Sequence, residues 1–154
     1  MSLFVYNKEI PSKIDDNIKV IEFKCKNYDF DVCEIINGLN SECDTLIFFH
    51  KISQNLSDLN DKIKNINFFA YGNSINALPH NLENLWLCFE VKNNITNLPI
   101  NLHNLYFMSR YNFHINNIFK YVTKIPHGCK LFISENDVTC KLKIPFKYKN
   151  ISDE

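Results

Sequence analysis

The residues of this chain that could do chemistry are its cysteines and histidines. In His127-Gly128-Cys129 a thiol lies two residues after an imidazole, a combination that serves nucleophilic catalysis when the imidazole activates the thiol. Cys129, however, stands where other repeats of the chain have leucine, and burial there would make the thiol inert. We therefore expect no catalytic residue and no enzymatic activity.

Three cysteines in the first third of the chain are the candidate metal ligands. Cys25, Cys33 and Cys43 are separated by seven and nine residues, which matches no closed zinc spacing, and no histidine lies between them. The chain also contains neither a Gly-rich phosphate loop nor a Cys-x-x-Cys pair. The sequence therefore predicts no metal and no cofactor, and its six cysteines are expected to be reduced, mostly packed thiols.

Leucine, proline and asparagine recur at a fixed spacing and divide the chain into repeats. The phrase LPHNLENLWL at 78–87 returns twenty residues later, at 98–107, as LPINLHNLYF, and the same apolar spacing recurs towards both ends of the chain. One such unit cannot bury its apolar side alone, so the units must stack. The period predicts a leucine-rich-repeat-like solenoid.

Each unit is expected to be a short strand followed by a return path, because the prolines could not donate to a central strand. The strands should start near Ile21, Leu46, Ile66, Leu85, Leu105 and Leu131. Leu3–Tyr6 is the expected N-terminal cap strand, and the phrase that ends at Ile151 would begin another strand just as the chain stops. The predicted fold is mainly β, with about six to seven short parallel strands and mostly irregular return segments.

Two insertions lengthen individual repeats. Apolar residues recur at three- and four-residue intervals over 31–39 and 115–122, which predicts a helix of one or two turns at each, so one or two short helices in all. The chain is expected to form a single domain over 1–154. Its parts would be a cap strand and turn at 1–17, repeats at 18–151 and an acidic tail at 152–154.

The phrase at 78–87, followed by Val91 and Ile95, resembles the FNIP repeat, a leucine-rich-repeat variant seen in amoebae and in the giant viruses that infect them. In the next copy Tyr111-Asn112 stands where that repeat has Phe-Asn, and Ile115 stands where it has its following isoleucine. The resemblance covers residues 59–130 and implies the leucine-rich-repeat fold. Because the first 45 residues already carry repeat-like spacing, we do not expect the F-box-type adaptor segment that FNIP proteins often carry.

Charge excludes two classes of partner. Seventeen basic residues balance seventeen acidic ones, so no net field attracts nucleic acid or an anionic membrane. The sequence shows neither an export signal nor an apolar run long enough to span a bilayer. We therefore expect an intracellular, reducing location: the cytoplasm, or the host cytoplasm or virion if the protein is viral.

The strand residues that should point away from the core are mostly apolar. They are Phe49, Phe69, Trp86, Tyr106, Met108 and Phe132, with Ile47, Asn67, Cys88 and Ser134 beside them. A merely solvated face would be polar, and exposed apolar area marks an interaction site. The predicted function is a non-enzymatic scaffold that presents this concave face to a protein partner.

The alternative is a structural or assembly subunit of a viral particle or a larger complex. Such a subunit would form a homo-oligomer through the apolar face or through the C-terminal edge of the sheet. Both functions depend on the strand register, because a shift by one residue would exchange the buried and exposed faces.

Overall fold

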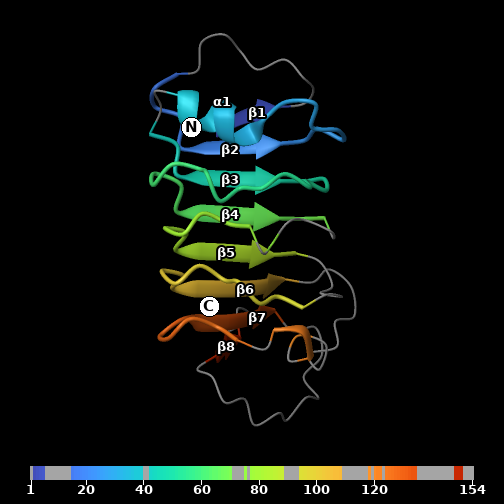
Figure 1. Cartoon of the computed structure of the whole chain (residues 1–154), viewed down its shortest axis with the longest axis vertical. Coiled ribbons are helices and arrows are strands. Elements are labelled where there is room, and N and C mark those ends of the chain that lie inside the picture. The colour runs from blue at the N-terminus through green and yellow to red at the C-terminus, as the bar shows by residue number, and fades with distance from the viewer. Residues whose placement is uncertain are drawn as a thin grey trace.

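The computed structural model describes residues 2–5, 15–39, 42–70, 75, 77–88, 94–108, 118, 120–122, 124–134 and 148–150. Its strands form one parallel sheet in which the spatial order of the eight strands is their order in the sequence (Figure 1). The strands are β1 (Ser2–Val5), β2 (Val20–Phe23), β3 (Thr45–Phe48), β4 (Asn65–Phe68), β5 (Asn84–Leu87), β6 (Asn104–Met108), β7 (Lys130–Ser134) and β8 (Tyr148–Asn150).

The register of the sheet follows the sequence repeat. The second residues of β2 to β7 lie opposite one another in a single row, and none of them is more than 1% exposed. These residues are Ile21, Leu46, Ile66, Leu85, Leu105 and Leu131. They are also the residues at which the repeat predicts strands, so the predicted strand positions and facing are confirmed.

A second buried row lies two residues further along the same strands, because alternate strand residues share a face. In this row Phe48 stacks between two other rings, with centroids 5.0 Å from Phe23 and 5.4 Å from Phe68. All three rings are fully buried, and each burial contributes about 1.5–3 kcal/mol. Leu82 and Leu102, from the return paths, belong to the same core.

The helix α1 (Val32–Gly38) lies within the first predicted insertion. It begins after Asp31, whose side chain accepts a hydrogen bond from the Glu34 amide, and it buries an apolar side against the core. In the second insertion only Ile118 and residues 120–122 are described; Ile118 and residues 120–121 are helical. None of the helices in the described part of the chain is long and apolar enough to cross a bilayer.

The C-terminal end of the sheet differs from the sequence prediction. The strand β8 pairs with β7, so the sheet has one strand more than expected and a strand at its C-terminal side. Tyr148 lies opposite Leu131, three residues earlier than Ile151, where the repeat placed the next strand. Pairing satisfies the backbone groups along the edge of β7, and this requirement outweighs the apolar spacing. The predicted acidic tail, 152–154, lies outside the described residues.

Candidate interaction face

The sheet face opposite the core, here called the outer face, carries two columns of side chains. The first column runs in register through Ile47, Asn67, Trp86, Tyr106 and Phe132. The second column, two residues further along the chain, contains Phe49, Phe69 and Cys88. All eight side chains are partly exposed, in contrast to the buried residues between them. The outer face is therefore in contact with solvent.

Five aromatic rings of the outer face form two stacks. Phe49 and Phe69 lie 4.8 Å apart with their planes only 2° from parallel. Trp86 lies 4.7 Å from Tyr106, which lies 4.5 Å from Phe132. The structure thus brings together five of the six predicted binding residues. The sixth, Met108, belongs to β6, and its side chain is outside the described part.

The two stacks are offset, because the rings change column between β4 and β5. In the β4 repeat the ring is Phe69, in the second column, whereas in the β5 repeat it is Trp86, in the first column. The other position of each repeat holds a smaller side chain, Asn67 and Cys88 respectively. The Cys88 thiol donates to Asn67 Oδ1 at 3.2 Å. A polar contact therefore crosses the outer face where one stack ends and the other begins.

Charge marks the N-terminal limit of the ring stacks. Glu22, which lies opposite Ile47 in register, forms an ion pair of 3.3 Å with Lys24. Lys24 Nζ also lies 5.0 Å from the centroid of the Phe49 ring, within range of a cation–π attraction. The outer face therefore passes from a charged pair at β2 to stacked rings from β3 onwards.

An amide ladder runs beside the aromatic columns, at the first residues of β3 to β6. Asn65 Nδ2 donates to Thr45 Oγ1 at 3.1 Å, Asn84 Nδ2 to Asn65 Oδ1 at 2.7 Å, and Asn104 Nδ2 to Asn84 Oδ1 at 2.6 Å. Such ladders hold neighbouring strands in register. In the sequence this ladder corresponds to an asparagine directly before the first core residue in three successive units, a pattern that the high asparagine content of the chain obscures.

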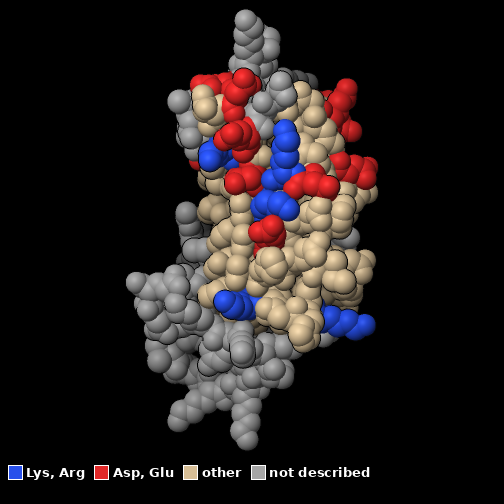
Figure 2. Space-filling model, turned by 90° about the vertical axis from the view of Figure 1, so that its left-hand side faces the viewer, with Lys and Arg blue, Asp and Glu red and all other residues tan. Residues whose placement is uncertain are grey.

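The side of the molecule at which the strands begin is charged near the N-terminal strands and mostly uncharged near the C-terminal ones (Figure 2). Lys19, Asp44, Lys64 and Glu83 stand at equivalent positions before successive strands, joined by backbone hydrogen bonds from each amide to the carbonyl of the preceding unit. The signs of their charges alternate, and Lys64 pairs with Glu83 at 3.3 Å. Because neighbouring charges cancel, this side of the molecule creates no electrostatic field of a single sign.

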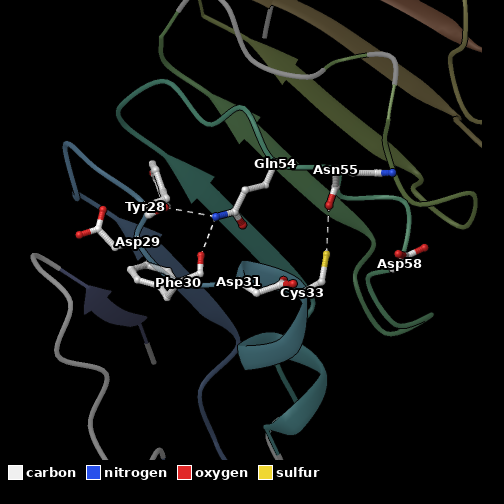
Figure 3. A pocket seen from close by; sticks show the side chains of 8 residues that line it. All are labelled: Tyr28, Asp29, Phe30, Asp31, Cys33, Gln54, Asn55 and Asp58. Carbon is white, nitrogen blue, oxygen red and sulfur yellow. Dashed lines mark hydrogen bonds between the residues drawn. The ribbon is translucent and has the colours of Figure 1, made fainter.

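A hollow of about 540 Å³ lies between the first insertion and the next return path (Figure 3). The side chain of Gln54 binds the backbone of the insertion through both ends of its amide: Gln54 Oε1 accepts from the Val32 amide at 2.9 Å, and Gln54 Nε2 donates to the Phe30 carbonyl. The Cys33 thiol donates to the Asn55 carbonyl at 3.3 Å. These contacts fasten the insertion to the following repeat, and we assign the hollow this structural role.

The cysteines considered for chemistry are buried. Cys129 is 6% exposed whereas His127 is exposed, and burial raises the pKa of the Cys129 thiol to about 11. Burial also raises the pKa of the Cys25, Cys33 and Cys43 thiols. Within the described ranges, no three residues of the metal-binding types lie close enough to share an ion.

Comparisons of this chain with models of known protein families, with curated proteins and with solved structures find no match. The outer face, with its two ring stacks and charged N-terminal boundary, is therefore the feature on which a function can be based.

Proposed function

We propose that this chain is a leucine-rich-repeat solenoid of the FNIP kind that acts as a non-enzymatic protein-interaction module. Its outer face binds a protein partner through the two ring stacks. The observation that carries the proposal is the row of partly exposed, stacked rings from Phe49 on β3 to Phe132 on β7. A face that only met water would carry polar side chains at these positions.

Two physical properties of the stacks support binding. Each ring packs against at least one other ring of its stack, so less side-chain freedom remains to be lost when a partner binds. Tryptophan and tyrosine are also enriched among the residues that carry most of the binding energy of interfaces. Trp86 and Tyr106 lie side by side in the longer stack and are the expected centre of the contact.

Co-purification from the cells in which the protein occurs tests the proposal. Trp86→Glu and Tyr106→Glu should lose the partner that the wild-type chain retains, while circular dichroism and Tm stay nearly unchanged. Ile100→Glu is the matched control, since Ile100 is an apolar side chain that is 81% exposed on a return path. Where a glutamate variant does not fold, Tyr106→Ser replaces it. Retention of the same proteins by folded variants of both residues would refute the proposal.

Sedimentation equilibrium separates this function from that of an assembly subunit. An interaction module that is purified without its partner should sediment as a monomer. If the pure chain forms a stable oligomer that Trp86→Glu dissociates, its neighbours in an assembly are copies of itself, and the assembly role replaces the one proposed.

A further inference from the structure

The apolar part of the outer face is narrow. From Ile47 on β3 to Phe132 on β7 it crosses four strand spacings, about 19 Å, and its two columns lie about 7 Å apart. Allowing for the side chains, this corresponds to a contact on the order of 300 Å² on this chain, whereas a stable complex of two globular proteins buries about 800 Å² on each side. The face is too small to hold a second copy of this chain firmly, and its dimensions fit one slender segment.

On the basis of the proposed function, we infer that the segment is an amphipathic α-helix of the partner, lying along the ring stacks. The backbone groups of β3 to β7 are already occupied by neighbouring strands. An extended peptide laid over this face would bury N–H and C=O groups without partners, at a cost of about 1–3 kcal/mol for each. A helix bonds its own backbone groups and does not meet this cost.

Helix geometry matches the dimensions of the stacks. A length of about 19 Å corresponds to about 13 helical residues, and a helix about 10 Å across covers both columns. Apolar residues on one face of a helix recur every three or four positions and advance by about 4.5–6 Å, close to the strand spacing of about 4.8 Å. Successive apolar residues of the helix therefore meet successive strands.

The orientation of the rings restricts the ligand chemistry further. Because Trp86, Tyr106 and Phe132 face one another at 4.5–4.7 Å, the inner faces of the stack are covered and its ring edges point outwards. Ligands that bind by stacking on ring faces, such as sugars and nucleobases, find few faces available. Branched aliphatic side chains need only close contact with the edges, and these are the side chains that an amphipathic helix presents.

Selection from two peptide libraries tests the inference on the whole chain. Both libraries contain peptides of about 16 residues with equal composition: in one, apolar residues recur every three or four positions, and in the other they alternate. Each library is selected on the wild-type protein and depleted on Tyr106→Glu, or on Tyr106→Ser if the glutamate variant does not fold. Trp86 is the single tryptophan of the chain, so its fluorescence reports contact with the outer face.

The helix-patterned library should yield peptides that shift the Trp86 emission to shorter wavelength. Their affinity should fall about tenfold or more in Tyr106→Glu, as for a central interface residue, and stay unchanged in Ile100→Glu. Enrichment from the alternating library alone, or from neither library, would overturn the helix inference while co-purification still decides whether the face binds protein. A dimer that Tyr106→Glu dissociates would also overturn it, because a second copy would then occupy the face.

Discussion

Phe48 and Phe49 are neighbours in the chain, yet their rings belong to separate stacks on opposite faces of the sheet. Phe48 is fully buried, 5.4 Å from Phe68, whereas Phe49 is partly exposed and lies 4.8 Å from Phe69. The alternation of strand side chains produces this separation. The two positions therefore allow stability and surface recognition to be altered independently.

Replacing these two rings should have unequal effects on stability. Phe48→Ala leaves a cavity among buried rings and is expected to lower the free energy of unfolding by about 3–5 kcal/mol. Phe49→Ala removes a partly exposed ring and should cost less than about 1.5 kcal/mol. Urea unfolding followed by circular dichroism measures both values. Equal losses would mean that Phe49 contributes to the core as much as Phe48 does.

The amide ladder should contribute measurably to folding. Asn84→Ala removes the bond to Asn65 and the bond from Asn104, and we expect a loss of about 1–3 kcal/mol in the free energy of unfolding. The exposed Asn101, which donates to Asn81 at 3.1 Å, provides the control. Asn101→Ala should cost a few tenths of a kcal/mol, since water replaces its partner. A similar cost at both positions would argue against a special role for the ladder.

Thiol labelling should distinguish the outer face from the core. Burial raises the pKa of Cys43 and Cys129 to about 11, so their thiolate fraction at pH 8 is on the order of 0.1%. Cys88, partly exposed on the outer face, should react with a disulfide reagent before Cys43 and Cys129, which should react only after unfolding. Mass spectrometry assigns each modified cysteine. Rapid labelling of Cys129 in the folded protein would contradict its burial.

The same pKa shifts predict a pH dependence of stability. A thiol titrates near 9 in the unfolded chain, so the folded state holds the protons of Cys43 and Cys129 more tightly. Their contribution is complete below pH 9 and is lost as the pH rises from 9 to 11. Melting curves should show this loss, and it should be smaller in Cys43→Ala/Cys129→Ala. An unchanged pH profile in the double variant would assign the loss to other groups.

Gln54→Leu tests the attachment of the first insertion. The variant keeps the size of the side chain but loses its hydrogen bonds to Val32 and Phe30. Hydrogen exchange over 28–38 should become faster, while exchange in β4 to β7 stays close to the wild-type rate. Equal acceleration throughout the sheet would show that this contact supports the whole fold and not the insertion alone.

The core and its register could be predicted from sequence because they depend on apolar periodicity. Leu85 and Leu105 recur twenty residues apart, and parallel stacking places them side by side. Helix α1 followed from apolar spacing in the same way. Strand alternation likewise identified Trp86 and Tyr106 as neighbours on the outer face, although the near-parallel stacking of their rings needed coordinates.

The structural features that the sequence did not predict depend on partners distant in sequence. Gln54 has no periodicity and gains its role from backbone groups 22 and 24 residues away. The asparagines of the ladder were visible but could not be separated from the asparagine-rich composition of the chain. Tyr148 begins β8 because this segment pairs with the edge of β7, and apolar spacing does not predict which residues form such a pair.

The amide ladder has a direction. The Thr45 hydroxyl donates its hydrogen to Asp44 Oδ1 at 2.6 Å, so its oxygen accepts from Asn65. The same constraint passes to Asn84 and Asn104, whose amides each donate to the unit that precedes them in the chain. During synthesis on the ribosome, the units of β4, β5 and β6 therefore each meet a ladder acceptor in a unit that was made before them.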